Sequence, residues 1–127
     1  MKEIIRRYFW AVAFFGWSII LLILAVIPSS GLIEESNDKD NFRWDYLEHF
    51  GVFVFFAILF GFWRKRQLKS ANKEILMFLI FGGIYAAGTE LTQLFVETRS
   101  FNHVDLALNL GGLVVGLLIV RIYVIKS

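Results

Sequence analysis

Long apolar runs, separated by short polar segments, set the pattern of the chain. The run over residues 8–27 has no charged residue. At about 1.5 Å of helical rise per residue it is long enough to cross about 30 Å of hydrocarbon. Three further runs, at about 46–63, 75–96 and 104–124, approach the same length and hold a few polar residues each. This pattern predicts an all-α membrane protein, a compact bundle of four transmembrane helices.

The composition favours a membrane protein over a soluble domain. Hydrophobic residues make up 57% of the 127-residue chain and its mean hydropathy is +0.63, more apolar surface than a small soluble domain can bury. The length fits a single domain over residues 1–127. No cleavage motif of small residues follows the first run, so we expect it to remain as an anchor. The absence of cysteine excludes disulfides, cysteine zinc sites and thiol catalysis.

The Lys and Arg residues divide unevenly between the two sides of the predicted bundle. Of the 13, ten fall near the N-terminus, in the 64–73 connection or near the C-terminus, and three fall in the two other connections. Cytoplasmic loops carry the excess of Lys and Arg, so we expect an N-in, C-in topology. The net charge of +2 comes from helix ends rather than from one basic face, which argues against nucleic acid as a partner.

Polar residues recur inside the predicted spans, where each is costly and calls for a functional or structural reason. Glu90 lies within the third span, and Gln93 follows on the same helical face. In the fourth span Asp105 and Asn109 share one stripe with a Gly-x-x-x-Gly motif at 112–116. The motif predicts that another helix approaches closely along the stripe that carries these polar residues.

Further polar residues fall at the same, outer end of the predicted bundle. Histidine titrates near neutral pH, so His49 is a candidate general acid or base, with Glu90 as its partner or a second base. Arg99, in the connection between the last two spans, is a candidate clamp for a phosphate or carboxylate. We therefore expect a site in the outer third of the bundle. Its candidate catalytic residues are His49, Glu90 and Asp105, and its candidate binding residues are Asp45, Gln93, Arg99 and Asn109.

No cofactor is expected, because the sequence holds no phosphate loop, nucleophile elbow or recognised metal motif. A divalent cation bound by His49, Glu90 and Asp105 is the open alternative, since imidazole and carboxylate groups are common metal ligands. A cavity that opens to the outer leaflet is expected beside the site. The acidic connection over residues 28–45 is a candidate lid for it.

Four of the candidate residues also have a purely structural interpretation, whereas His49 is harder to explain in this way. Asp45 would cap the second helix, and Asp105 would be a first-turn acid that faces the helix dipole. Glu90 would form an ion pair with Arg99, and Asn109 would be a buried hydrogen-bond bridge between helices. On this interpretation the polar cluster only holds the helices together.

Two blocks of the sequence resemble the VanZ-like family of small bacterial membrane proteins. The segment Asp45-Tyr-Leu-Glu-His49-Phe is similar to that family's Asp-Lys-x-x-His-Phe. The second block is similar to the family's Glu-x-x-Gln, Arg-x-Phe and Asp-x-x-x-Asn, and reads Glu90-Leu-Thr-Gln93, Arg99-Ser-Phe101 and Asp105-Leu-Ala-Leu-Asn109. Tyr46 and Phe53 depart from the Lys and Tyr that the family usually has, so no cation or phenol is expected at these positions.

The resemblance implies a multi-pass protein of the bacterial plasma membrane. The family is named for an accessory protein linked to low-level resistance to teicoplanin, a lipid-bearing glycopeptide antibiotic, and many relatives have no link to resistance. The implied partners are membrane lipid and a lipid-linked envelope molecule or glycopeptide. We therefore expect a polar site at the outer leaflet that acts on or binds a cell-envelope lipid or lipoglycopeptide. The alternative is a structural or partner-binding scaffold.

Overall fold

Helices account for nearly all of the chain that can be described. The computed structural model describes residues 1–26, 44–70, 72–96 and 103–126. The elements are α1 (Lys2–Val26), α2 (Trp44–Trp63), α3 (Lys65–Ser70), α4 (Asn72–Thr92), the 3₁₀ helix η1 (Gln93–Phe95) and α5 (His103–Lys126). The described residues include four helices that are long and apolar enough to cross a membrane. These helices confirm the predicted all-α membrane fold.

The helix boundaries differ from the sequence prediction in two basic segments, one at the N-terminus and one at residues 64–73. Helix α1 begins at Lys2 rather than near residue 8, because Lys and Arg are good helix formers whose long side chains reach the headgroup region from inside a helix. The 64–73 segment, predicted as a plain connection, contains the six-residue helix α3. Leu68 of α3 is only 3% exposed, so this short helix is held by its contact with the core.

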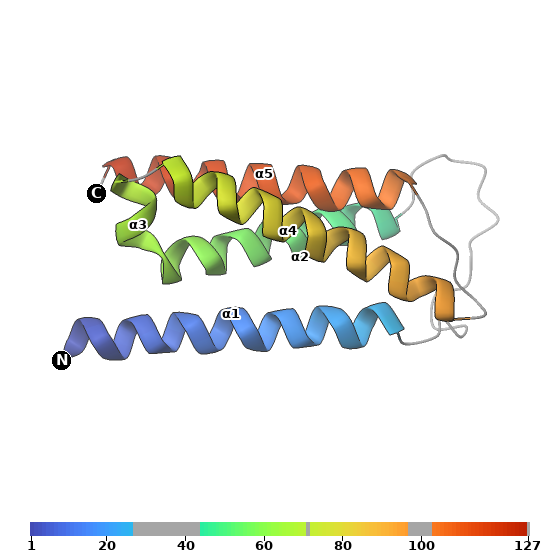
Figure 1. Ribbon diagram of the computed structural model, residues 1–127, viewed down its shortest axis with the longest axis horizontal. Helices are drawn as coiled ribbons and strands as arrows, with labels where there is room; N and C mark the ends of the chain where they lie inside the picture. Colours follow the sequence, from blue (N-terminus) through green and yellow to red (C-terminus); the bar gives the residue numbers. More distant parts are fainter. Residues whose placement is uncertain (27–43, 71, 97–102, 127) are drawn as a thin grey trace.

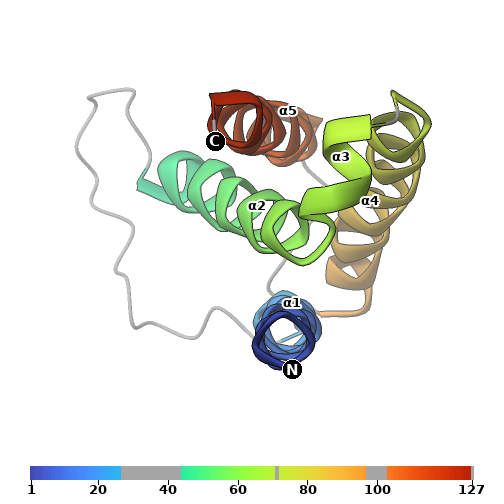
Figure 2. The same ribbon diagram turned by 90° about the vertical axis from the view of Figure 1, so that its left-hand side faces the viewer.

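The four long helices run alternately up and down, so the two termini lie at the same end of the bundle, beside α3 (Figure 1). In the end view α2 lies between α1 and α5, and α4 packs beside α5 (Figure 2). Helix α1 has two buried residues, Leu21 and Ala25, and is the most peripheral of the four. The common end of the termini agrees with an even number of crossings, while the N-in, C-in orientation stays a prediction.

The closest helix pair, α2 and α5, is packed through glycine. A Cβ atom on Gly112 would lie 2.5 Å from the backbone oxygen of Phe50, and one on Gly116 would lie 2.5 Å from that of Val54. A side chain at either position would have to push the backbone of α2 away. The Gly-x-x-x-Gly motif therefore brings the polar face of α5 directly against α2, as its spacing predicted.

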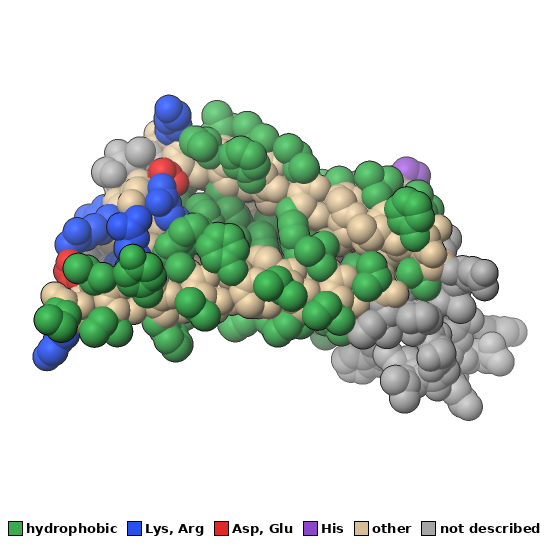
Figure 3. Space-filling model, turned by 60° about the horizontal axis from the view of Figure 1, so that its bottom comes forward, with side chains coloured by type: hydrophobic (Ala, Val, Ile, Leu, Met, Phe, Trp, Pro, Cys, Tyr) green, Lys and Arg blue, Asp and Glu red, His purple; other side chains and the backbone are tan. Residues whose placement is uncertain are grey.

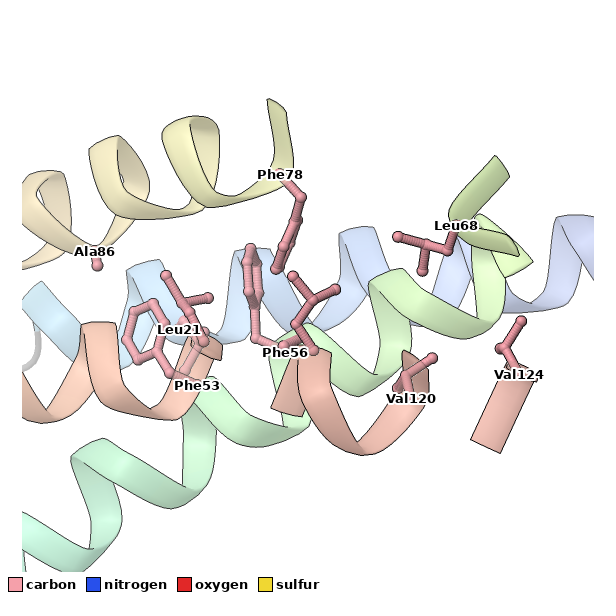
Figure 4. Close-up of a cluster of buried hydrophobic side chains, with 11 residues drawn as sticks. Leu21, Phe53, Phe56, Leu68, Phe78, Ala86, Val120 and Val124 are labelled. Atoms are coloured by element: carbon pink, nitrogen blue, oxygen red, sulfur yellow. The ribbon is translucent and has the colours of Figure 1, made fainter. Parts of the chain in front are cut away.

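Aliphatic and aromatic side chains together fill the core between the helices (Figure 4). Phe56 of α2 stacks on Tyr85 of α4 with ring centroids 5.1 Å apart, and Phe60 stacks on Phe78 at 4.1 Å. Two hydrogen bonds join α1 to α2 and to α4. The Trp17 indole donates to the Val52 carbonyl at 3.1 Å, and the Tyr85 hydroxyl donates to the Ser18 carbonyl. These contacts fix the rotations of α1, α2 and α4 about their axes, and therefore the directions in which the polar residues of these helices point.

Candidate functional site

The described charges separate along the length of the bundle. All described Lys and Arg residues lie at or near the end where the termini and α3 meet, which we call the basic end (Figure 3). The polar residues of the predicted site lie toward the other end, in the first turns of α2 and α5 and the last turns of α4. The candidate site and the cationic surface are therefore on opposite sides of the apolar middle of the protein.

Four polar side chains from three helices form one connected group, which we call the polar network: His49, Glu90, Asp105 and Asn109. The Asn109 amide nitrogen Nδ2 donates a hydrogen bond to Glu90 Oε1 at 3.0 Å. The Asn109 oxygen Oδ1 lies 3.1 Å from His49 Nδ1. Since an amide oxygen only accepts, His49 Nδ1 carries the hydrogen of this second bond. Asn109 of α5 thus joins α2 to α4, the bridging role that its residue type predicted.

Both carboxylates of the polar network approach the same imidazole ring. His49 Nε2 lies 3.6 Å from Asp105 Oδ2, and His49 Nδ1 lies 3.6 Å from Glu90 Oε1. Asp105 lies in the first turn of α5, as predicted, where the helix dipole favours its negative charge. Its Oδ1 atom is buried and has no hydrogen-bond partner among the described residues. The network therefore has acceptor capacity that the described protein groups do not use.

Burial within the polar network is graded. Glu90 and Asn109 are 0% exposed, the Asp105 side chain is 13% exposed and that of His49 is 21% exposed. A molecule that arrives from outside the bundle meets the imidazole and the Asp105 carboxylate before it meets Asn109 or Glu90. Chemically, this edge offers an imidazole nitrogen and carboxylate oxygens, which suit hydrogen-bond donors, protons or a cation.

The same residues include a possible metal-ligand set. One ligand atom from each of His49, Glu90 and Asp105 can be chosen so that all three lie within 4.8 Å of one another. Asn109 supports them from behind, because it bonds to both His49 and Glu90. Ligand orientation by such a neighbouring hydrogen-bond partner is usual in protein metal sites.

The remaining predicted site residues do not join this group in the described structure. Gln93 lies in η1 and is buried, but no hydrogen bond joins its side chain to the polar network within the described ranges. Asp45 is the second residue of α2, inside its first turn rather than before it, and its side chain lies outside what is described. Arg99 and the 27–43 segment also lie outside the described residues, so the anion clamp, the Glu90–Arg99 pair, the lid and the outer cavity stay predictions.

The polar contact between Tyr85 and the Ser18 carbonyl, which ties α1 to α4, was not predicted from the sequence. Both residues are uncharged and lie within apolar runs, so they do not stand out as the ionisable residues do. Their spacing gives no signal either, since the contact joins residues 67 positions apart.

Comparison with known proteins gives one family. The family model described as VanZ/LLP1 matches residues 14–124, a range that includes the whole polar network. Neither the curated protein sequences nor the solved structures provide a match to this chain.

Proposed function

This chain belongs to the VanZ/LLP1 family, and from that premise we propose that its polar network is a site at the outer leaflet of the bacterial plasma membrane. The site binds, or acts on, the headgroup of a cell-envelope lipid or of a lipoglycopeptide. The observation that carries the proposal is the graded burial of the network. The fully buried Asn109 bonds to Glu90 and orients the part-exposed His49, and the other nitrogen of His49 faces Asp105 at the edge of an apolar bundle.

The position of the basic end supports the assignment to the outer leaflet. Cytoplasmic segments of membrane proteins carry the excess of Lys and Arg, and all described Lys and Arg residues lie away from the polar network. With the basic end in the cytoplasm, the network is at the depth of the outer leaflet. Its partners are then headgroups that face the cell wall.

The chemistry of the exposed edge supports a polar headgroup as the ligand. His49 Nε2 and the Asp105 carboxylate are acceptors, which match the hydroxyl, amide and ammonium donors of glycolipids, lipid-linked sugars and peptides. Arg99 is assigned the anionic part of the ligand, such as a phosphate or carboxylate. If the site performs chemistry, His49 is the residue placed to exchange a proton with the ligand. The family link to teicoplanin makes a lipoglycopeptide one of the candidate ligands.

The proposal is tested in a glycopeptide-sensitive Gram-positive host. Wild type, His49→Ala and Glu90→Gln are expressed, and teicoplanin susceptibility is measured beside the membrane abundance of each protein. His103→Ala is the matched control, because His103 begins α5 and is exposed outside the polar network. We expect wild type and His103→Ala to protect the host, and the two network variants to lose protection at equal abundance.

Two other results contradict the proposal in different ways. Equal protection by wild type and by well-accumulated network variants shows that the network is not the working site. Loss of protection only in proportion to loss of protein shows a scaffold, in which the polar residues hold the helices together. If wild type gives no protection, the lipoglycopeptide part fails, and comparison of the membrane lipids of the same strains tests the lipid part.

A further inference from the structure

The hydrogen bonds of Asn109 determine which nitrogen of His49 carries a hydrogen. Asn109 Nδ2 donates to Glu90, so Asn109 Oδ1 faces His49 Nδ1 and accepts from it. In the neutral imidazole the other nitrogen, Nε2, then has a lone pair. This lone pair faces Asp105 Oδ2, a second electron-rich atom, at 3.6 Å. Two acceptors that face each other at this partly buried edge favour a positive group or a hydrogen-bond donor between them.

The distance between the two atoms distinguishes the candidates. A direct N–H···O bond is about 2.7–3.2 Å long, so at 3.6 Å the two atoms are farther apart than such a bond, although they are close enough for an ion pair if the imidazole is protonated. A bridging water with two bonds of about 2.8 Å holds its partners roughly 4.5 Å apart, so 3.6 Å is too short for it. A metal ion with bonds of about 2.1 Å holds neighbouring ligands roughly 3.0–3.6 Å apart. The observed separation fits the metal ion.

A third ligand is within reach. The ligand atoms of His49, Glu90 and Asp105 lie within 4.8 Å of one another. Two atoms bound to one ion with bonds of about 2.1 Å are at most about 4.2 Å apart. Glu90 Oε1 approaches His49 Nδ1, at 3.6 Å, so binding through Nε2 requires the Glu90 carboxylate to turn toward the other side of the ring. The independent sign of a missing partner is Asp105 Oδ1, which is buried and has no hydrogen-bond partner in the described part of the chain.

We propose that His49, Glu90 and Asp105 bind one divalent transition-metal ion of the Zn²⁺ or Mn²⁺ class, through Nε2 of His49 and one oxygen of each carboxylate. An imidazole ligand favours these ions over Mg²⁺ and Ca²⁺, which prefer oxygen. The inference rests on the site of the proposed function. It adds a metal ion that would act there as a Lewis acid. The open positions of the ion face the exposed edge, where they polarise a phosphoryl or carbonyl oxygen of the headgroup. With the ion bound, His49 acts as a metal ligand oriented by Asn109, a role that replaces the proton exchange assigned to it in the metal-free site.

The test is the metal content of the full chain. The protein is purified in detergent with an affinity tag that contains no histidine, and Zn and Mn are measured per chain by elemental mass spectrometry. The metal-free protein is then titrated with Zn²⁺, Mn²⁺ and Mg²⁺ while thermal unfolding is followed. We expect about one Zn or Mn per wild-type chain, and a rise in the unfolding temperature with Zn²⁺ or Mn²⁺ that Mg²⁺ does not produce.

Matched variants decide between this site and adventitious metal. His49→Gln and Asp105→Asn are expected to lose the metal and the temperature shift, while His103→Gln keeps both. His49 is part-exposed, so His49→Gln carries the test if Asp105→Asn does not fold. Metal-free wild type without a temperature shift, or a His49→Gln variant that retains the metal, overturns the proposal. Neither readout depends on lipid or antibiotic, so failure here leaves the proposed function standing, and failure of the susceptibility test leaves the metal site standing.

A second inference comes from a cavity at the basic end, far from the polar network. The cavity has a volume of about 330 Å³ and is lined by the start of α1, the end of α2 and the helix α3. Its lining includes four cations, Arg6, Arg7, Lys65 and Arg66, and the indole rings of Trp10 and Trp63. A cavity with this lining combines the charge that attracts phosphate with the amphipathic rings typical of the headgroup level.

The described residues neutralise only some of the cations of this cavity. Arg66 pairs with the Glu3 carboxylate at 2.5 Å, and Lys65 Nζ lies 5.3 Å from the centroid of the Tyr123 ring. Arg6 and Arg7 have no ion-pair partner among the described residues. The structure assigns this cavity to the phosphate headgroup of an anionic phospholipid, such as phosphatidylglycerol or cardiolipin, with Arg6 and Arg7 as its principal contacts.

The experiment compares two double variants with the same loss of charge. Arg6→Gln with Arg7→Gln removes cations from the cavity, whereas Lys69→Gln with Lys73→Gln removes two cations of the same end that do not line it. Each protein is delipidated in detergent and its binding of phosphatidylglycerol and phosphatidylcholine is measured. Wild type is expected to prefer phosphatidylglycerol, and the Arg6/Arg7 variant to bind it roughly 30-fold more weakly.

The control variant is expected to bind phosphatidylglycerol as wild type does. An equal loss in both double variants shows attraction by total charge alone and overturns the assigned cavity, as does equal binding of the two lipids by wild type. A competition experiment with inorganic phosphate tests whether the cavity binds free phosphate instead of a lipid. If it displaces phosphatidylglycerol at low millimolar concentration, the cavity recognises free phosphate rather than a lipid, and the lipid assignment is wrong.

Discussion

Asn109 of α5 donates a hydrogen bond to Glu90 of α4 at 3.0 Å. Both side chains are completely buried in a bundle of helices that are apolar enough to cross a membrane. The same amide accepts from His49 of α2, so one residue orients the two ionisable groups that the proposed site depends on. Burial of a carboxylate in this surrounding is costly without hydrogen-bond donors, and the Asn109 amide is one of the donors that stabilise Glu90 there.

Truncation of Asn109 is therefore expected to destabilise the fold. Asn109→Ala removes the donor to Glu90 Oε1 and leaves that oxygen buried, which costs about 1–3 kcal/mol of unfolding free energy. Equilibrium unfolding in mixed micelles with a denaturing detergent measures the loss. Val115→Ala, on a lipid-facing position of the same helix, is the control and should change the free energy by less than about 0.5 kcal/mol. Equal effects of the two changes contradict the assigned role of Asn109.

The close packing of α2 on α5 predicts a sharp difference between glycines. Gly116→Ala places a methyl group against the backbone of Val54, and because backbone cannot turn aside, we expect a loss of about 1–3 kcal/mol. Gly88→Ala in α4 meets nothing within 4 Å, and the better helix propensity of alanine should stabilise it by up to about 1 kcal/mol. The same unfolding assay compares the two variants. A Gly116→Ala protein as stable as wild type contradicts the observed helix approach.

Much of this arrangement could be predicted from the sequence because lipid restricts it so strongly. The four spans follow from apolar length, and the gathering of His49, Glu90, Asp105 and Asn109 follows from polar residues at similar depth. The close approach of some helix to the α5 stripe follows from the two glycines, whereas only the structure shows that this helix is α2. These features depend only on spacing along one helix and on the alternating direction of successive helices.

The rest depends on contacts between distant residues, which spacing along the chain does not encode. Which atom of the Asn109 amide faces His49 depends on how α5 packs against both α2 and α4, because the amide nitrogen bonds to Glu90 and the amide oxygen to His49. The Arg66–Glu3 pair joins residues 63 positions apart, and both residues line the cavity at the basic end. Helix α3 forms where only a polar connection was expected, because one leucine, Leu68, reaches the core.

The orientation of the protein is directly measurable because the chain has no cysteine of its own. His103→Cys, at the start of α5, and Lys126→Cys, at its end, each introduce a single thiol at opposite ends of the bundle. A membrane-impermeant maleimide is expected to label His103→Cys in intact cells, and to label Lys126→Cys only after the membrane is opened. The reverse pattern places the polar network at the cytoplasmic leaflet and contradicts the proposed contact with envelope headgroups.

The central claim is that the polar network binds an envelope headgroup, and its most direct measurement is the lipid that the protein carries. Wild type, His49→Ala and His103→Ala are purified at equal abundance from the same Gram-positive membranes, and their bound lipids are compared by mass spectrometry. We expect one class of envelope lipid or lipid-linked precursor to be enriched with wild type and His103→Ala and lost with His49→Ala. Identical lipid profiles for all three proteins contradict the claim and leave the network a structural bridge between helices.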